Sequence, residues 1–487
     1  MQLIDFKNTF SFLPVWYMKT TLKALKVPVI FFCLTALIIQ PLLCSPALAF
    51  SVGDEKKVGD KLLSMVRTEY KIIDAPDITQ YINNLGQRIL KVTGPQYFNY
   101  HFFIINDKEF NAFAAPSGLI FINSGLLEAM DNEGELVSVM AHEIGHVTRR
   151  HISQQIDKSK KSSIGTAALL IAGIALGGGA LSQALISGSM AANASMNLKF
   201  SREDEEEADR LSYKWMQAMN MDPAPMATML EKMYKISVYQ MANVPPYLLT
   251  HPEPKRRLGY IQDMLLSAPP HKYPPRDDFP FLRVKYRIMS MTRDPATLRP
   301  IYQRQAEQAK EPLKSMADYG LYLIYLNGAE YDKAAAALQK VINHFKNKAI
   351  LQSDLGMIAF RRGRYSQALR DFQQALNADP GDAFSAYNQA EALEHLGREK
   401  EAMQIYQNLL SVIPDFTKLR FQLGKLLSDS GRTGAGHYQL GKYFWLNGDH
   451  KTAKYHLNQA LHDKTSDQET IQLAKEQLEK IKRVEKD

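Results

Sequence analysis

A spacing of thirty-four residues recurs in the C-terminal part of the chain and constrains its fold more than any other feature. Ala368 has counterparts at this distance in Ala334 and Ala402, and Pro380 is matched by Pro414. Aromatic residues recur in the same frame. Small, aromatic and proline positions with this period indicate helix pairs that stack on their neighbours, because one pair alone cannot bury its apolar face. The sequence therefore predicts an α-solenoid in this part of the chain.

The period becomes irregular toward the C-terminus. Gly424 and Gly441 each look like part of a first helix, although only half a repeat separates them, and the second helix expected after Gly431 is missing from the pattern. We therefore expect about four repeats of the tetratricopeptide (TPR) type with one extra helix. The TPR domain is expected over residues 306–487, with a charged capping helix over 465–485.

The N-terminus has the features of a secretory signal. Lysines precede an apolar stretch over 27–43, and Ala47 and Ala49 are the small residues of a cleavage site. We expect residues 1–49 to be a cleavable signal peptide, with an uncleaved anchor as the alternative. Both cysteines of the chain lie in this segment, so the exported protein must be stabilised without disulfides and cannot use a cysteine nucleophile.

The charge balance gives no reason to expect nucleic acid as a partner. The net charge of +8 falls to +5 once the four lysines and one aspartate of residues 1–49 are set aside. Runs of basic residues interleaved with aromatic ones, the pattern of a nucleic-acid-binding face, are not found in the sequence. At 487 residues the chain is too long for one hydrophobic core, so two or three domains are expected.

The positions of prolines and the spacing of apolar residues indicate where the domains of the exported chain begin and end. Residues 52–95 have apolar side chains at helical spacing, whereas 100–105 and the two segments after it are rich in aromatic and β-branched residues, which favour strands. Prolines are concentrated between 245 and 285 and indicate a stiff connection. We therefore expect a mainly α fold with a small β-sheet over 50–265, a Pro-rich linker over 266–305, and then the TPR domain.

The most informative chemical motif lies in the N-terminal domain. His142, Glu143 and His146 form H-E-x-x-H within an apolar stretch, 136–147, that predicts a buried helix. Residues four apart share one helix face, so both imidazoles can bind one metal ion. Two neutral imidazoles and a carboxylate suit zinc, and Glu143 is placed to act as a general base. The sequence thus predicts one Zn²⁺ per chain.

A catalytic zinc needs a third protein ligand, and a predicted helix over 201–218 provides candidates. Ser201 and Asp204 fit a capping box at the start of this helix. Glu205 is the candidate ligand, and Asp209, one turn on, can accept a hydrogen bond from a ligand histidine and fix its tautomer. The alternative is that this acidic run is a solvated helix face.

These residues together predict a zinc peptidase. Glu143 would take a proton from the water that attacks a peptide carbonyl and deliver it to the leaving amine. The oxyanion would need a further donor, for which Tyr247, His251 and Arg202 are candidates.

Two further features are expected to border the site. Segments 111–115 and 118–122 predict a strand pair with a turn, and either can hold an extended substrate by backbone hydrogen bonds; an ordinary interior sheet is the alternative. The apolar segment 164–190, rich in glycine, alanine and serine, suits a mobile hairpin over the cleft or a peripheral membrane contact. By its length it could also just span a bilayer.

Three segments resemble a known family. H-E-I-G-H at 142–146, S-R-x-x-E-x-x-A-D at 201–209 and T-H-P-x-P-x-x-R at 250–257 resemble the motifs of the metalloproteases related to HtpX and the CAAX prenyl proteases. With a signal peptide and C-terminal TPRs, the resemblance narrows to BepA-like (YfgC-like) periplasmic proteases. It implies a gluzincin with Glu205 as the third zinc ligand and Glu143 as the catalytic base.

The resemblance also implies a biological role. It predicts quality control of outer-membrane proteins in a Gram-negative periplasm, with unfolded or misassembled outer-membrane proteins as substrates. The TPR domain would dock on the β-barrel assembly machinery. The resemblance further implies that His251 lies on a loop that can close over the zinc, as a latch or fourth ligand. The residues alone leave a structural role for His251 equally open.

Two other functions compete with that of an active peptidase. The chain could be a TPR assembly factor or chaperone whose protease is mostly latent. It could also be an intramembrane protease built like HtpX, in which case the mature chain would not be found in a soluble periplasmic extract.

Overall fold

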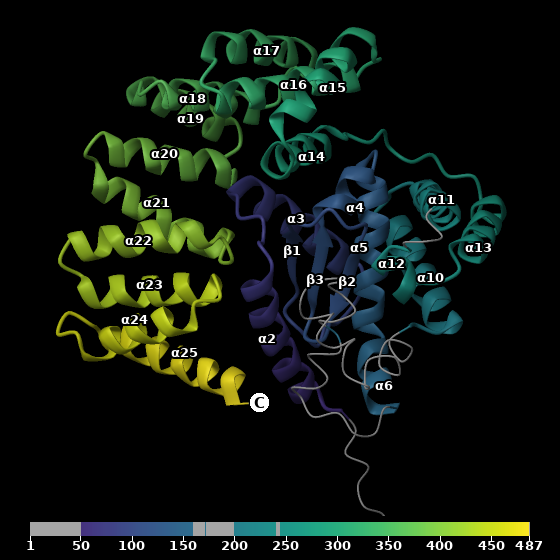
Figure 1. The fold of residues 1–487 in the computed structure, drawn as a ribbon, viewed down its shortest axis with the longest axis horizontal. Helices are drawn as coiled ribbons and strands as arrows, with labels where there is room; N and C mark the ends of the chain where they lie inside the picture. Colours follow the sequence, from purple (N-terminus) through teal and green to yellow (C-terminus); the bar gives the residue numbers. More distant parts are fainter. Residues whose placement is uncertain (1–49, 159–170, 172–198, 240–243, 487) are drawn as a thin grey trace, which may run out of the picture. The chain divides into compact units, whose positions relative to one another are not determined.

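The computed structural model describes residues 50–158, 171, 199–239 and 244–486 (Figure 1). The predicted signal peptide, 1–49, and all of the apolar segment 164–190 except Ile171 lie outside these residues. Within the described ranges, every helix is too short or too polar to traverse a membrane.

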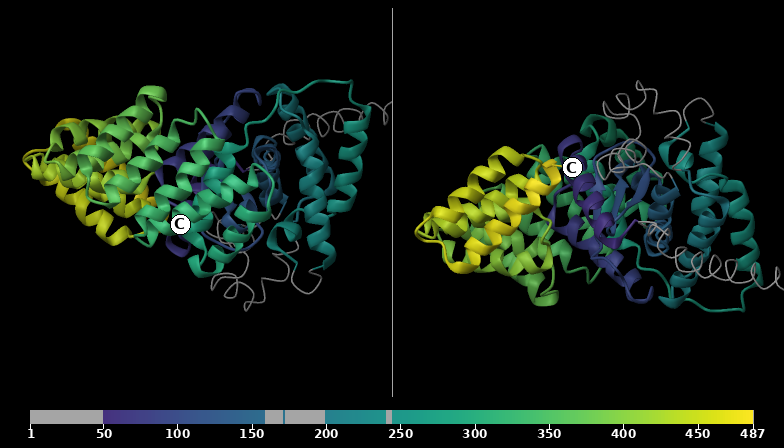
Figure 2. Two further views of the ribbon diagram at one scale, coloured as in Figure 1. Left: turned by 90° about the horizontal axis from the view of Figure 1, so that it is seen from above. Right: turned by 90° about the horizontal axis from the view of Figure 1, so that it is seen from below.

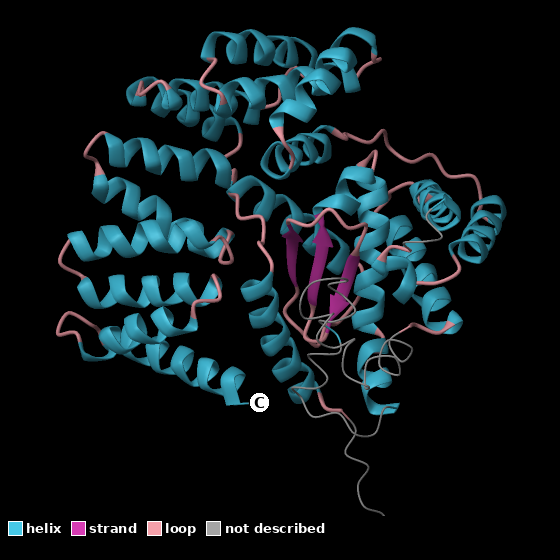
Figure 3. Ribbon diagram, viewed as in Figure 1, coloured by secondary structure: helices cyan, strands magenta, loops and turns pink. Residues whose placement is uncertain are grey.

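A three-stranded sheet forms the centre of the N-terminal domain (Figure 3). Its strands are β1 (His101–Ile105), β2 (Ala112–Ala115) and β3 (Leu119–Asn123), in the order β1-β3-β2. β3 pairs in parallel with β1 and antiparallel with β2, so both of its edges are used. Of the two segments expected to hold a substrate, only 111–115 lies at an edge. The prediction for 118–122 is wrong, because an interior strand has no backbone groups left for a peptide.

Helices that precede and follow the sheet in the sequence pack against it. Two N-terminal helices, α2 (Val52–Glu69) and α3 (Pro76–Leu90), precede β1, and α4 (Ser124–Ala129) and α5 (Glu133–Thr148) follow β3. α3 approaches β1 closely because Gly86 has no side chain: a Cβ atom there would lie 2.1 Å from the ring of Phe102. The helices predicted over 52–95 are confirmed, with a break between them.

The rest of the N-terminal domain is helical. After α5 come α6 (His151–Lys158), α10 (Arg202–Ala218), α11 (Ala224–Tyr239), α12 (Pro246–Thr250) and α13 (Pro254–Ser267). The capping box predicted for α10 is confirmed. The Ser201 hydroxyl accepts from the Asp204 N–H at 3.1 Å, and the Asp204 carboxylate accepts from the Ser201 N–H at 3.0 Å. α10 therefore begins at a defined point and packs along α5.

The segment expected to be a Pro-rich linker, 266–305, is largely helical. It contains α14 (Phe279–Thr292) and most of α15 (Pro295–Gln308). Pro280 and Pro295 lie in the first turns of these helices, where the missing N–H of proline costs no hydrogen bond. The expectation of a linker here is therefore corrected, since the non-helical residues of this segment are 268–278 and 293–294.

The TPR domain consists of helices that pack on their neighbours in sequence (Figures 1 and 2). They are α16 (Leu313–Asn327), α17 (Tyr331–His344), α18 (Ile350–Arg361), α19 (Tyr365–Ala378), α20 (Ala383–His395), α21 (Glu399–Val412), α22 (Thr417–Asp429), α23 (Thr433–Leu446), α24 (His450–His462) and α25 (Gln468–Lys486). The repeated alanines Ala334, Ala368 and Ala402 have no exposed surface, because they lie where paired helices meet.

α23, which follows Gly431, is the second helix of its pair, whereas the pattern around Gly441 indicated a first helix. Glycines on α23 allow its neighbours to approach closely, and its large apolar residues Trp445 and Leu446 pack with α24 and α25. A Cβ atom on Gly436 would lie 2.8 Å from the carbonyl oxygen of Gly424 in α22. The helices α16–α25 form consecutive pairs, and the last of them, α25, is the charged helix expected over 465–485, so the expected extra helix is paired with it or with its neighbour.

Buried polar contacts connect the TPR domain to the N-terminal domain. Arg283 of α14 donates to Asp77 of α3 at 2.7 Å and to Asp354 of α18 at 2.9 Å. None of these three side chains is more than 5% exposed. Asp74, just before α3, accepts from the Thr417 hydroxyl of α22 at 2.6 Å. The repeats are thus held against α2 and α3.

Candidate metal centre

The centre is formed where α5 and α10 cross at short distance. A Cβ atom on Gly145 would lie 3.2 Å from the Cα atom of Ala208. The small residues inside H-E-I-G-H and E-x-x-A-D therefore allow the two helices to approach. Every residue of α5 from Glu133 to Val147 is buried, as the apolar stretch predicts, so the polar motif residues lie inside the protein.

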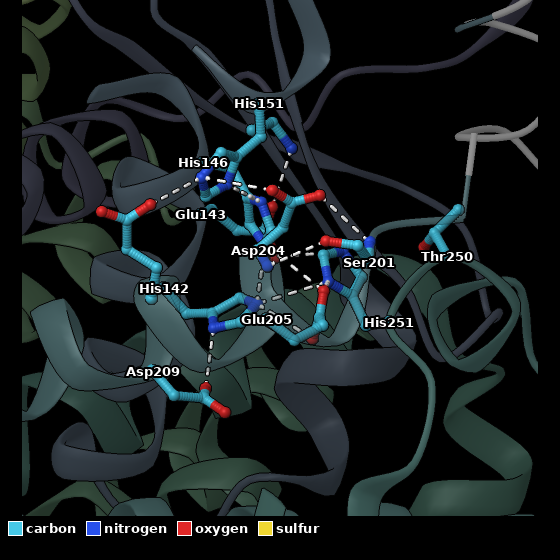
Figure 4. A network of polar contacts seen from close by, with 12 residues as sticks. His142, Glu143, His146, His151, Ser201, Asp204, Glu205, Asp209, Thr250 and His251 are labelled. Atoms are coloured by element: carbon cyan, nitrogen blue, oxygen red, sulfur yellow. Dashed lines mark hydrogen bonds and ion pairs between the residues drawn. The ribbon is translucent and has the colours of Figure 1, made fainter. Parts of the chain in front are cut away.

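Four potential ligands from three segments converge at this crossing (Figure 4). The Nε2 atoms of His142 and His146 are 3.0 Å apart, and the two oxygens of Glu205 lie 3.6 and 3.5 Å from them. His251, at the end of α12, completes the group. One donor atom of each residue lies within 4.8 Å of all the others, and none is more than 2% exposed.

Each histidine of the motif has its outer nitrogen held by a partner. Nδ1 of His142 lies 2.8 Å from Oδ1 of Asp209, and Nδ1 of His146 lies 3.0 Å from Nδ1 of His151. The Asp209 carboxylate accepts from Nδ1 of His142, and Glu207 accepts from Nε2 of His151, which leaves Nδ1 of His151 to accept from Nδ1 of His146. The Nε2 lone pairs of His142 and His146 therefore point to the centre.

The donor set fits a divalent metal ion of the zinc type. Imidazole nitrogens and a carboxylate oxygen are the ligands that zinc takes in proteins. The two Nε2 lone pairs face each other, and Oε1 of Glu143 is buried with no hydrogen-bond partner among the described residues. Buried acceptors that converge in this way are costly unless a cation lies between them.

Charged neighbours keep the carboxylates of the site ionised. Burial alone would raise the pKa of Glu205, but the charges of Arg257 and His251 outweigh it and hold this pKa well below its usual range. The pKa of Asp209 is lowered against burial in the same way, chiefly by Arg257. Burial lowers the pKa of His146 well below its usual value. Ionised carboxylates and a neutral imidazole are the forms that bind metals.

Sequence reasoning missed the role of His151. Its ring connects Nδ1 of His146 to Glu207, whose Oε2 lies 3.1 Å from Nε2 of His151. Only the backbone reveals this, because α5 ends at Thr148 and Arg150, at φ +56°, turns the chain so that His151 returns to the site. A histidine shortly after H-E-x-x-H was the only available signal.

The role of Arg257 was also missed, although the residue is part of the quoted T-H-P motif. Its guanidinium contacts Oε2 of Glu205 at 2.6 Å and Oδ1 of Asp209 at 2.7 Å, and it is 4% exposed. Asp209 also accepts from the Tyr260 hydroxyl. Arg257 therefore compensates the charge of both carboxylates and fixes the start of α13 to α10.

Glu143 lies between the ligand group and the sheet. Its Oε2 accepts a hydrogen bond of 2.9 Å from the N–H of Ala114 in β2. Because β2 is an edge strand of the described sheet, a peptide that paired with it would pass directly beside Glu143.

The candidate oxyanion donors fall into two groups. Nδ1 of His251 is 2.8 Å from Oε1 of Glu205, and the ring of Tyr247 stacks on His251 with 4.4 Å between centroids. Both residues therefore border the site. Arg202 does not: it pairs with Glu253 and its side chain is 64% exposed. Arg202 is wrong as a candidate because the first residue of α10 faces solvent.

The fold and the donor set are those of a metallopeptidase domain followed by an interaction domain. Peptidase family M48 matches residues 76–265, and the tetratricopeptide repeat family matches 353–413. The metalloprotease LoiP of Escherichia coli (strain K12) is 33% identical over 194 residues, which cover 39% of this chain and 70% of LoiP. The chain belongs to peptidase family M48.

Other relatives extend the similarity beyond the peptidase domain. The beta-barrel assembly-enhancing protease of Escherichia coli (strain K12) is 30% identical over 296 residues, which cover 60% of each chain. The putative beta-barrel assembly-enhancing protease of Vibrio cholerae is 27% identical over 405 residues, 76% of this chain and 83% of that protein. Among solved structures, the TPR protein YrrB is 17% identical with a TM-score of 0.27, covering 37% of this chain and 91% of YrrB. The resemblance to BepA-like proteases is thereby confirmed, although the aligned part of this chain spans only 60% of the Escherichia coli relative.

Proposed function

We propose that this chain is a zinc-dependent endopeptidase of the periplasm that degrades misassembled outer-membrane or exported proteins and assists outer-membrane protein assembly. The observation that carries the proposal is the buried group of His142, His146 and Glu205 beside Glu143. Membership of family M48 and relatives named for β-barrel assembly support the substrate class and the location.

The residues of the site suit hydrolysis of an extended peptide. His142, His146 and Glu205 would hold the metal, which when bound polarises the substrate carbonyl and lowers the pKa of water. The Ala114 N–H orients one oxygen of Glu143, and the other, 3.6 Å from Nε2 of His251, accepts no hydrogen bond in the described structure. Glu143 can therefore accept the proton of the attacking water and return it to the leaving amine. β2, an edge strand of the described sheet, would align the substrate backbone.

A second candidate function is favoured by His251. This residue lies inside the ligand group and its ring is 1% exposed, so it takes space that a substrate carbonyl would need. We propose that His251 acts as a latch or fourth ligand that keeps the peptidase latent. The chain would then work mainly as a TPR assembly factor or chaperone until the loop between α12 and α13 moves.

The partners are proposed from the repeats and from the relatives. TPR helices are interaction surfaces, and the β-barrel assembly machinery is the partner that the names of the relatives suggest. Peripheral membrane contact through 164–190 stays a prediction from the sequence.

Metal analysis combined with a casein cleavage assay tests the proposal. We expect one zinc per chain in the wild type and in Glu143→Gln, with cleavage lost only in the variant. Glu203→Gln, which changes an exposed carboxylate of α10, is the matched control and should cleave normally. Cleavage by Glu143→Gln, or absence of zinc from both proteins, would contradict the enzyme. Full rescue of an outer-membrane defect by Glu143→Gln would favour the assembly factor.

A further inference from the structure

A cavity of about 390 Å³ lies between the peptidase domain and the TPR domain. It is bordered by α2, by the segment that leads into β1, and by α23 and α25. None of its lining residues belongs to the metal centre. Its walls combine cationic and apolar side chains, including Lys56, Arg67, Lys442, Lys480, Trp445 and Leu446.

The two carboxylates that line the cavity are already paired. Oδ1 of Asp60 lies 2.7 Å from Nζ of Lys480. Asp415 is shared, with Oδ2 at 2.8 Å from Nδ1 of His101 and Oδ1 at 3.6 Å from Nη2 of Arg67. Neither carboxylate is therefore left to pair with Lys442.

Lys442 has no carboxylate partner among the described residues, and Arg67 has only the carboxylate of Asp415, which it shares with His101. No carboxylate in the described structure lies within 4.0 Å of Lys442, whose Nζ donates to the amide oxygen of Gln477 at 2.9 Å. Burial, followed by the charges of Arg420 and Lys480, lowers the pKa of Lys442 to about 7. The Arg67 side chain is 5% exposed, and its Nε has no acceptor among the described residues. An anion in the cavity would relieve both groups.

The shape and lining of the cavity limit which anion fits. Trp445 is 7% exposed and provides an apolar wall next to Lys442 on α23. A volume of about 390 Å³ can hold a carboxylate together with the side chain beside it, which is how the end of a polypeptide chain presents them. The nearby carboxylates of Asp60 and Asp415 would repel a phosphate dianion more strongly than a single carboxylate.

We propose that this cavity binds the free C-terminal carboxylate of a polypeptide whose last side chains are apolar. Lys442 and Arg67 hold the carboxylate, and Trp445 and Leu446 contact the apolar side chains. The site is separate from the peptidase centre, so the protein can hold the end of a partner or substrate independently of cleavage.

Fluorescence anisotropy of a labelled peptide tests the proposal. The protein is the full chain with Glu143→Gln, so that cleavage cannot interfere and the result does not depend on the proposed peptidase. A short peptide ending in two leucines is compared with the same peptide as its C-terminal amide. We expect the acid to bind at least about tenfold more tightly, the loss that follows from removing a charge-assisted hydrogen bond.

Variants locate the binding site. Lys442→Met keeps the volume of the side chain and removes a poorly compensated charge, so it should fold and bind the acid at least about tenfold more weakly. Lys480→Met should also bind the acid more weakly, because it removes another cation from the lining of the cavity. Lys451→Met, an exposed lysine on α24, should bind like the parent.

Three results would overturn the proposal. The first is equal affinity for acid and amide, and the second is unchanged affinity in both Lys442→Met and Lys480→Met. The third is binding of inorganic phosphate or of vesicles with anionic lipid while the acid peptide does not bind, which would identify a phosphate site instead.

Discussion

The contact between His146 and His151 predicts how strongly metal affinity depends on a residue outside the ligand group. Nδ1 of His146 is buried and has His151 as its hydrogen-bond partner, at 3.0 Å. Replacing His151 by alanine leaves this N–H unsatisfied, which costs about 1–3 kcal/mol. The corresponding loss of affinity is about 5- to 150-fold, which agrees with the roughly 10- to 100-fold effect of removing partners that orient ligand histidines. We therefore expect His151→Ala to weaken zinc binding about 10- to 100-fold.

Competition with a chelating dye at pH 7 measures this loss in the full chain. His151→Gln should recover part of the affinity, because its amide oxygen can accept the same hydrogen bond. His271→Ala, an exposed histidine that contacts Asn220, should bind zinc like the wild type. A change smaller than about threefold in His151→Ala would refute the reasoning, since the Nδ1 proton of His146 would then not need this partner.

Three further predictions concern latency, domain contact and pH. His251→Ala should raise cleavage of unfolded casein about tenfold, the value of one charge-assisted hydrogen bond to the site; unchanged or lower cleavage would count against a latch. Arg283→Met should lower the free energy of unfolding in urea by about 3 kcal/mol, because Asp354 is left buried without its guanidinium, whereas Arg293→Met, at a half-exposed pair, should cost less than about 1 kcal/mol. Burial would raise the pKa of Asp415, but His101 and Arg67 lower it to about 2 in the folded protein. A lowered folded pKa stabilises above the unfolded value of about 4, so the advantage of wild type over Asp415→Asn should shrink by about 2 kcal/mol between pH 5 and pH 2; a constant difference would show that this carboxyl is not perturbed.

The peptidase motifs could be predicted because their chemistry depends on local spacing. H-E-x-x-H in an apolar run places two imidazoles on one face of a buried helix, whatever the rest of the chain does. The capping box at Ser201 fixes where the second helix begins, and hence where Glu205 and Asp209 point. The edge position of β2, by contrast, depends on strand order, which no local pattern contains.

The predictions from the sequence were wrong where tertiary packing, and not a local sequence pattern, decides the structure. Proline density around 266–305 indicated a linker, but prolines in the first turn are compatible with the helices found there. α23 was expected to be a first helix because Gly441 fits that position of the pattern, whereas its packing between α22 and α24 makes it the second helix of a pair. Arg202 was misplaced because a motif position does not say which way a side chain at a helix start faces.

The sequence by itself determined the class of chemistry and the repeat architecture, since both depend on residues at fixed short spacings. Only the tertiary structure decided what surrounds them. His151 and Arg257 reach the metal centre through a backbone turn and through the packing of α13, and His251 enters the ligand group from a loop far along the chain. The basic cavity between the domains likewise exists only because helices distant in sequence bring their charges together. Contacts of this kind are set by the global packing of the chain, which a local sequence pattern does not specify.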